Sequence, residues 1–371
     1  MKFTLIQVFR GVAAMLVIMH HLIANTTNHL NYVAYGNFFN FGFIGVDFFF
    51  VLSGFIITYV HFSDLTSSDN IRARCLSFFK KRFIRIYPIY WVVAVITLLI
   101  YLKSTPQFMK DEGLTMDLTS PVIQSLLIKS FLLIPDEAMR LIGVAWTLSY
   151  EVLFYLVFGL SITFGFKFAK WTGLAWAILI VVNSFVSRPE NEYLNFFFNI
   201  IILEFLVGCV VAYLIRMKAN IPLKFTAPVL AILSIFLLKN MHIEGLVFQR
   251  ELLSVMAMAL FFGVLTYMAV DFDLKNTSIK FPAFLVLIGD ASYSIYLTHN
   301  MSLSAMTRIY SKLNPGFSET GYLALVATLI FAGSVVGGVI VHLLIEKKLL
   351  TWLNKKAAPQ KAKPVRETEL V

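Results

Sequence analysis

The first hydrophobic stretch of the chain, IQVFRGVAAMLVIMHHL (residues 6–22), decides the class of fold. It is apolar enough to form a helix that crosses a bilayer, and its length is close to the approximately 20 residues that such a helix needs. It also carries Arg10 near one end and His20 and His21 near the other. Ionisable side chains are costly inside a membrane, so these residues need protein or water around them.

Helical geometry places Arg10 and His21 on one face, because eleven residues at about 100° each make three turns plus about 20°. The two side chains are separated by about 16 Å along the axis, and His20 lies about 80° from Arg10. The same face carries small residues, namely Gly11, Ala13, Ala14 and Val17. The pattern predicts one wall of a polar slot. The alternative is that Arg10 and His21 reach the two membrane interfaces without taking part in chemistry.

The composition extends this interpretation to the whole chain. Of 371 residues, 58% are hydrophobic and 14% charged, and the mean hydropathy is +0.78. These values exclude a soluble domain and predict an all-α polytopic membrane protein, because the alternating segments of an outer-membrane barrel are missing from the sequence. Cys75 and Cys209 are isolated, which predicts neither a disulfide framework nor a zinc site, and we expect no metal.

Apolar runs predict about ten transmembrane helices. They lie near residues 5–24, 38–60, 83–102, 142–166, 171–187, 196–215, 226–240, 250–270, 282–309 and 321–345. An even number places both termini on one side, which holds most of the 31 Lys and Arg residues. The positive-inside rule then predicts an N-in/C-in orientation. Because the basic residues follow the membrane, the net charge of +10 does not indicate a nucleic-acid partner.

The predicted organisation is one transmembrane domain, residues 1–352, followed by a basic cytoplasmic tail, residues 353–371. We expect this tail to be disordered and to lie against anionic membrane lipids. The longest extracytoplasmic loop, residues 103–141, contains the apolar segment PVIQSLLIKSFLLIP (residues 121–135). That segment is too short to span a bilayer comfortably and predicts an interfacial or re-entrant helix.

Two acidic residues stand inside apolar segments. Asp47, in FIGVDFFFVLSGFI, is expected either to orient a histidine or to cap a helix, and the following Ser53-Gly54 pair favours close helix packing. Glu151 is the only charge in AWTLSYEVLFYLVFG and is expected about 14 Å into the membrane. It can pair with Arg10 or a histidine, stay neutral, or carry protons.

A basic pair precedes the third predicted span. Arg82 and Arg85 are three residues apart and share one helical face, and their planar guanidinium groups suit phosphate. The pair can hold a phosphorylated cofactor, or it can bind anionic lipid and set the topology. At the end of the last span, Glu346 with Lys347 and Lys348 is expected to form a salt-bridged helix end.

The segment IGDASYSIYLTHN (residues 288–300) is unusually polar for a membrane helix. Ser292, Tyr296 and His299 follow an i, i+4, i+7 pattern on one face, with Tyr293 nearby. Since lipid offers no hydrogen bonds, this face must line a cavity or pack against one.

Together these segments resemble the acyltransferase 3 family, which are multi-spanning membrane acyltransferases that modify bacterial surface glycans and some other acceptors. Five features carry the resemblance: the Arg10 to His21 spacing, the Arg82 and Arg85 pair, GVDFFFVLSGF, AWTLSYEVLFY and GDASYSIYLTH. They extend from the first predicted helix to the ninth. The sequences of these segments are most similar to the branch of the family that is found with exopolysaccharide production.

The resemblance implies a protein of the bacterial inner membrane. Its donor would be a cytoplasmic acyl-CoA, most often acetyl-CoA, and its acceptor a hydroxyl of an extracytoplasmic glycan or lipid-linked saccharide such as exopolysaccharide or O-antigen. Other proteins of glycan synthesis are candidate partners. Some family members carry a second, hydrolase-like domain; we expect this chain to acylate its acceptor directly or with a separate partner.

The expected site follows from the resemblance and from the residues themselves. Its catalytic residues would be His21, Glu151 and Asp47, with His21 acting as general base or as acyl carrier. The residues expected to bind the donor are Arg10, Arg82 and Arg85. The candidates for substrate or oxyanion contacts are Tyr150, Ser292, Tyr293, Tyr296 and His299.

Two other functions stay open on the sequence. A secondary transporter or flippase would explain the charges within the membrane, but such proteins usually show inverted repeats and broken helices in corresponding halves, which the sequence does not reveal. A membrane scaffold of a glycan-synthesis complex would explain the basic inner surface, but it leaves His21 and Glu151 without a role.

Overall fold

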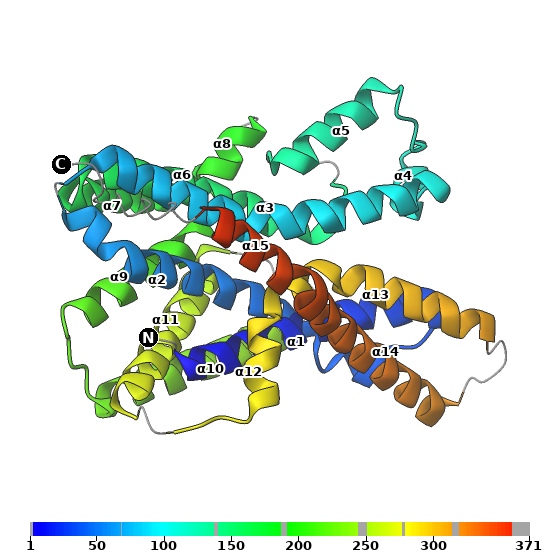
Figure 1. Ribbon diagram of the computed structural model, residues 1–371. Coiled ribbons are helices and arrows are strands. Elements are labelled where there is room, and N and C mark those ends of the chain that lie inside the picture. Colours follow the sequence, from blue (N-terminus) through cyan, green and yellow to red (C-terminus); the bar gives the residue numbers. More distant parts are fainter. Residues whose placement is uncertain are drawn as a thin grey trace, which may run out of the picture.

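The computed structural model describes residues 3–67, 69–136, 140–186, 191–243, 251–276, 279–313 and 319–357 (Figure 1). Over these residues the chain is a bundle of helices without strands. The all-α polytopic prediction is therefore confirmed. The predicted tail begins inside the last helix, and residues 358–371 lie outside the described residues, so the boundary at residue 352 stays a prediction.

The longer helices are α1 (Thr4–Leu30), α2 (Ile44–Thr66), α3 (Ile71–Lys103), α5 (Pro121–Leu132), α6 (Trp146–Phe164), α7 (Phe166–Phe185), α9 (Ile202–Arg216), α10 (Leu223–Ile243), α11 (Leu252–Lys275), α13 (Ser292–Leu313), α14 (Thr320–Val341) and α15 (Lys347–Ala357). Shorter helices are α4 (Gln107–Asp111), α8 (Glu192–Phe197) and α12 (Ala283–Asp290). Short turns are η1 (Ala34–Asn37), η2 (Asn40–Phe43), η3 (Gly143–Ala145) and the π-helical η4 (His342–Glu346).

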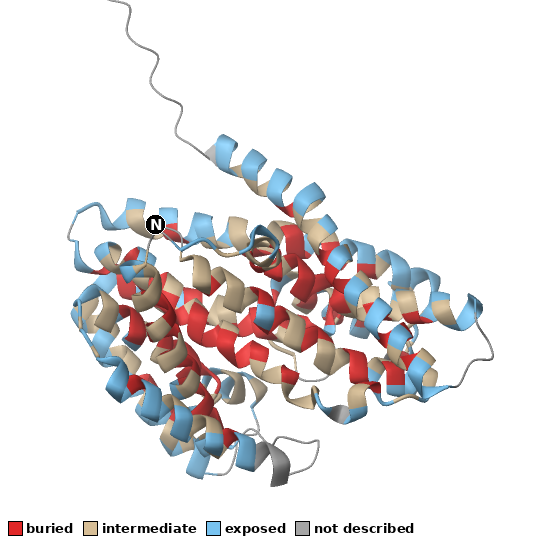
Figure 2. Cartoon of the chain, turned by 90° about the horizontal axis from the view of Figure 1, so that it is seen from below, coloured by how far each residue is buried: buried red, intermediate tan, exposed pale blue. Residues whose placement is uncertain are grey.

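Each of the ten predicted spans holds helical residues. Within the described part of the chain, eight helical segments are long and apolar enough to cross a membrane. The number ten and the N-in/C-in orientation stay predictions. Outward-facing apolar side chains such as Leu160, Leu174 and Ile178 are exposed, as expected of surfaces that face lipid, while buried residues gather in the middle of the bundle (Figure 2).

Two predicted spans are broken rather than continuous. The span expected at 282–309 divides at Ala291 into α12 and α13, which run in different directions (Figure 1). Gly289 and Asp290, both weak helix formers, precede the break. The span expected at 196–215 is interrupted between α8 and α9, where the Asn199 side chain accepts a hydrogen bond from the Ile201 amide at 3.0 Å. Such local bonds compete with the helix.

Helix α3 begins at Ile71, twelve residues before the predicted span, so the basic segment is helical. At its middle, Tyr87, Tyr90 and Trp91 donate hydrogen bonds of 2.7 to 3.1 Å to the carbonyls of residues 130–132. These carbonyls lie in the last turn of α5, where a helix leaves carbonyls without helical partners; that of Ser130 also accepts from the Leu133 amide. Helix α5 therefore ends halfway along α3, and the choice between an interfacial and a re-entrant helix stays a prediction.

Small residues bring the central helices into close contact. A Cβ added to Gly289 would lie 1.9 Å from the Gln7 carbonyl oxygen, and one added to Gly45 would lie 2.4 Å from that of Ala13. The small-residue stripe of α1 is thus buried against α12 and α2. It does not line an open slot beside His21, and that part of the sequence prediction is wrong.

Helices α2 and α9 cross in the same way. A Cβ on Gly54 would lie 2.0 Å from the Phe205 carbonyl oxygen, and one on Gly208 would lie 2.0 Å from that of Val51. The packing role expected for Gly54 is confirmed. Its neighbour Ser53 faces the other way, into the cavity described below.

We expect Gly289→Ala to destabilise the protein by about 1–3 kcal/mol or more, because the methyl group meets backbone rather than a movable side chain. The measurement is the thermal unfolding midpoint of the purified protein in detergent. Gly321→Ala is the matched control, since a Cβ at that helical position meets no atom within 4 Å. Equal midpoints for the two variants would contradict the predicted contact.

Candidate functional site

A cavity of about 780 Å³ lies within the bundle and is lined by α1, α2, α3, α6, α12, α13, α15 and the turn that joins α14 to α15. Its volume is in the range of small-molecule and cofactor sites. Seven of the predicted site residues line it: Arg10, Arg82, Arg85, Glu151, Ser292, Tyr293 and Tyr296.

The strongest polar cluster of the cavity is centred on Glu346, which is fully buried. Its carboxylate accepts from Arg85 Nη1 at 2.9 Å and from Ser294 Oγ at 2.7 Å, and it lies 2.8 Å from His342 Nδ1. Glu346 ends the π-helical turn η4, and such turns occur often at functional sites. The helix end expected to be salt-bridged through Lys347 and Lys348 is thus paired differently, because the basic partner of Glu346 is Arg85.

Glu151 lies on the opposite wall of the cavity, on α6. Its Oε1 accepts a hydrogen bond from Ser53 Oγ at 3.4 Å and a short one from the Tyr155 hydroxyl. The Arg82 guanidinium lies 5.8 Å from the Tyr155 ring centre, and its Nε is buried without a hydrogen-bond partner among the described residues. Arg82 is thus held by aromatic contact and keeps donors available.

Arg10 lines the same cavity from α1. Its Nη1 donates to Gln7 Oε1 at 3.0 Å, one turn earlier in the helix. Asp290, at the break before α13, also lines the cavity. The cavity thus brings three arginines together with acidic residues from α6, α12 and η4.

Tyr293 and Tyr296 line the cavity from α13. The Tyr293 hydroxyl donates to the Ile86 carbonyl at 2.9 Å, and the Arg85 guanidinium lies 5.1 Å from its ring centre. The Tyr296 hydroxyl lies 3.1 Å from Thr147 Oγ1. Ser292 Oγ, at the start of α13, is buried without a hydrogen-bond partner among the described residues.

The two histidines of the prediction lie together, outside the cavity lining and just beyond Tyr296. The His299 ring centre is 5.8 Å from that of Tyr296 and 4.8 Å from that of His21. Phe49 also packs on Tyr296, with ring centres 6.1 Å apart. The ring contacts therefore lead from Tyr296 in the cavity lining through His299 to His21.

The histidine rings are oriented by backbone carbonyls. His21 Nδ1 lies 2.9 Å from the Val17 carbonyl oxygen, and His299 Nδ1 lies 2.7 Å from that of Tyr296. In a neutral ring Nδ1 is then the donor, and Nε2 keeps its lone pair. His299 Nε2 is buried without a hydrogen-bond partner within the described residues.

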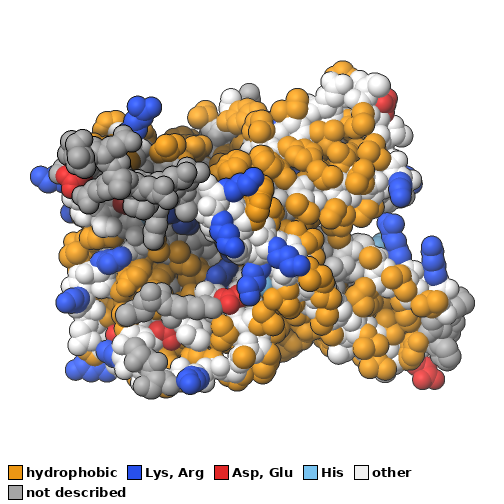
Figure 3. Space-filling view, viewed as in Figure 1, with side chains coloured by type: hydrophobic (Ala, Val, Ile, Leu, Met, Phe, Trp, Pro, Cys, Tyr) orange, Lys and Arg blue, Asp and Glu red, His pale blue; other side chains and the backbone are white. Residues whose placement is uncertain are grey.

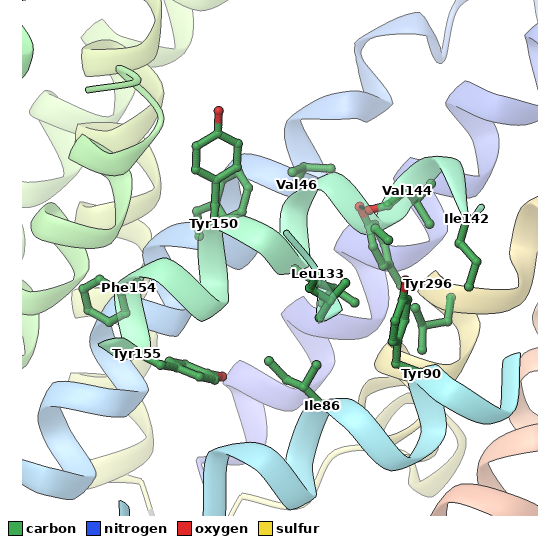
Figure 4. Close-up of a cluster of buried hydrophobic side chains, with 14 of the residues drawn as sticks. Val46, Ile86, Tyr90, Leu133, Ile142, Val144, Tyr150, Phe154, Tyr155 and Tyr296 are labelled. Carbon is green, nitrogen blue, oxygen red and sulfur yellow. Dashed lines mark hydrogen bonds between the residues drawn. The ribbon is translucent and has the colours of Figure 1, made fainter. Parts of the chain in front are cut away.

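Asp47 and Tyr150 are not among the residues that line the cavity. Asp47 is fully buried in the first turn of α2. Tyr150 stacks on Phe196, with ring centres 4.2 Å apart, and it projects from a different side of α6 than Tyr155 does (Figure 4). Substrate contact by Tyr150 would need a site other than this cavity.

Several cavity residues were missed by the sequence prediction. Besides Glu346 they are Ser53, Lys81, Tyr155, His342 and Lys347. The spacing of His342 and Glu346, four residues apart at the end of an apolar run, was the available signal. Among the described residues, no group of three or more His, Cys, Asp or Glu side chains could hold a metal ion.

Comparison with known proteins adds the family. Residues 4–344 match the acyltransferase domain of the acyltransferase 3 family, which is nearly the whole chain. The chain belongs to this family. It is also similar to the exopolysaccharide production protein ExoZ of Rhizobium meliloti (strain 1021), at 26% identity over 320 residues, which cover 85% of this chain and 92% of the relative. No solved structure gives a significant match.

Family membership confirms the resemblance drawn from the sequence motifs. It makes the chain a multi-pass membrane acyltransferase. The cavity combines three arginines with acidic residues and hydroxyl groups, a set of side chains that is chemically suited to an anionic ligand.

Proposed function

We propose that this acyltransferase moves an acetyl group from cytoplasmic acetyl-CoA to a hydroxyl of an extracytoplasmic glycan, at the inner membrane of a bacterium. The similarity to a protein of exopolysaccharide production supports exopolysaccharide as the acceptor. One observation carries the proposal: the cavity has basic side chains at its mouth, and the pair of His21 and His299 lies just beyond its other end.

The cavity suits a donor that is anionic at one end and less polar at the other. Arg82 and Arg85 would hold the phosphates of acyl-CoA, because guanidinium groups bind phosphate through two parallel hydrogen bonds. The pantetheine arm would extend past Arg10 and Glu151 toward Tyr296, all of which line the cavity. The thioester would then lie next to the tyrosine that borders His299.

His21 would act as general base through Nε2, since its Nδ1 is engaged by the Val17 carbonyl. The acceptor oxygen gives its proton to Nε2 and attacks the thioester carbonyl; the C–S bond breaks, and the CoA sulfur leaves with the proton. In the second version His21 Nε2 first attacks the thioester carbonyl and the CoA sulfur leaves; the acceptor oxygen then takes the acyl group from Nε2, and its proton passes to the CoA sulfur. Ser292 Oγ, buried without a hydrogen-bond partner among the described residues, lies about 10 Å before His299 along α13 and would contact the donor rather than the oxyanion.

The reaction requires a movement. Tyr296 and Phe49 line the cavity and pack on each other, whereas His21 does not line it, so these rings would have to part when the thioester reaches the imidazole. Such a closed end would also keep water and ions from crossing the membrane when no donor is bound. Glu151 would balance the charge of the arginines rather than orient His21, because its hydrogen bonds go to Ser53 and Tyr155.

A transporter or flippase is the second candidate, and the break between α12 and α13 is the observation that favours it. Discontinuous helices form the substrate sites of many secondary transporters. The two functions differ in their product, since only the acyltransferase forms a covalent ester. The scaffold alternative predicts neither transport nor ester formation.

The test is transfer of radiolabelled acetyl from acetyl-CoA to glycan in inside-out membrane vesicles. We expect label on glycan inside the vesicles that contain the protein, and none in vesicles from a strain without it. Equal labelling in both would assign the reaction to another enzyme. Transport of unmodified glycan without labelling would favour the flippase.

The rate of transfer should depend on pH. A neutral His21 is needed to accept a proton, so activity should rise with pH through the midpoint of the imidazole titration, which is near 6.5 for an unperturbed histidine. The measurement is the initial rate in permeabilised vesicles at saturating acetyl-CoA. A transfer rate that stays constant from about pH 5 to 8 would argue against His21 as the general base.

A further inference from the structure

We infer that helix α15 forms a second half of the donor site, which binds the 3′-phosphate of CoA through Lys347 together with Lys81 of α3. This inference rests on the proposed function, in which acyl-CoA is the donor. It assigns a binding role to helix α15. The sequence alone predicted a salt-bridged helix end at residues 346–348 and a disordered tail from residue 353 onward.

The placement of α15 supports this role. Helix α15 packs against α3 and crosses the half of α3 that carries the basic residues (Figure 1). Lys347, Thr351 and Asn354 follow an i, i+4, i+7 spacing, and all three line the cavity. Lys and Arg side chains gather along this helix in the middle of the molecular face (Figure 3).

The balance of charges supports a polyanionic ligand. Four basic side chains line the cavity near α15, namely Lys81, Arg82, Arg85 and Lys347. The buried carboxylate of Glu346 pairs with Arg85, whereas Lys81 and Lys347 form no ion pair with any described residue. An anionic ligand would supply the missing counter-charge.

The order of groups along CoA matches the order of these side chains. The pyrophosphate follows the pantetheine arm, and the 3′-phosphate, with a charge of about −1.5 to −2 at neutral pH, lies at the far end of the molecule. Arg82 and Arg85 are half-buried, whereas Lys81 and Lys347 are exposed at the rim. The arginines therefore suit the pyrophosphate, and the two lysines suit the 3′-phosphate.

The experiment compares the binding of CoA and of 3′-dephospho-CoA to the full-length protein in lipid nanodiscs, by isothermal titration calorimetry. We expect the wild type to bind CoA about tenfold more tightly than 3′-dephospho-CoA, because only CoA offers the 3′-phosphate for hydrogen bonds with the lysine ammonium groups. Lys347→Met should weaken the affinity for CoA by about this factor and leave the affinity for 3′-dephospho-CoA unchanged. Lys81→Met should act in the same direction.

Lys348→Met is the matched control, because Lys348 is exposed on the same helix but does not line the cavity. It should change neither affinity. Equal wild-type affinities for the two ligands would overturn the inference, as would a Lys347→Met variant that weakens both ligands equally or a Lys348→Met variant that behaves like it. These outcomes leave the proposed function standing, whereas a wild type that binds neither ligand would overturn the donor itself.

Discussion

His21→Ala should reduce acetyl transfer by at least about a hundredfold while the protein stays folded in the membrane. A positioned general base contributes about 10²–10⁴-fold, and an acyl carrier contributes at least as much, so both versions of the mechanism predict the loss. The ring of His21 packs edge to face on His299, and its removal leaves the bonds of Glu346 and Glu151 in the cavity intact. CoA binding should therefore persist.

The measurement is the initial rate of label transfer at saturating acetyl-CoA, together with the thermal midpoint of the purified variant. His20→Ala is the matched control: His20 is the adjacent histidine, and its Nδ1 lies 2.8 Å from the Asn40 carbonyl oxygen. It should keep its rate within about tenfold of the wild type, because no step of the mechanism uses it. A His21→Ala variant that retains more than a tenth of the wild-type rate would contradict both versions.

The two versions can then be separated in the wild type. Without an acceptor, an acyl carrier would hold labelled acetyl on His21, and the label would be lost in His21→Ala. A general base leaves the protein unlabelled under the same conditions.

The members of the candidate site could largely be predicted from the sequence. Arg10, Glu151 and Tyr296 are polar or charged residues in apolar segments, and the cost of burying such groups was enough to indicate a shared polar interior. The helices that carry them follow from apolar runs of sufficient length. These inferences need only local sequence, because each concerns a side chain and its own helix.

The arrangement of the site could not be predicted in the same way. The partners of Glu346 come from helices far apart in sequence: Arg85 is 261 residues away and Ser294 is 52 residues away. Helical spacing placed His21 on the face of Arg10, but it could not reveal that Gly45 and Gly289 press against that face and close the expected slot. Nor could spacing reveal that α12, the helix before the break at Ala291, packs against α1.

The second large effect concerns Arg85, whose removal should both destabilise the protein and weaken donor binding. Arg85→Ala leaves the carboxylate of Glu346 buried, with Ser294 and His342 as its remaining partners among the residues that the structure describes. Breaking a buried ion pair on one side costs about 3–5 kcal/mol; because Arg85 is partly exposed and two partners remain, we expect about 2 kcal/mol here. The KM for acetyl-CoA should rise about tenfold or more through loss of a phosphate contact.

The double variant Arg85→Ala/Glu346→Gln separates these two roles. It removes the unpaired charge, so the thermal midpoint should recover most of its loss, but it cannot restore a phosphate contact, so the KM should stay high. If Arg85 were only a structural partner of Glu346, the KM would recover together with stability. Arg82→Ala is the comparison, because Arg82 forms no ion pair with an acidic residue in the described part of the chain. This variant should raise the KM with little change in the midpoint. Recovery of both the midpoint and the KM in the double variant would show that Arg85 does not bind the donor. Arg82 and the lysines at the rim, Lys81 and Lys347, would then be the remaining donor-binding residues.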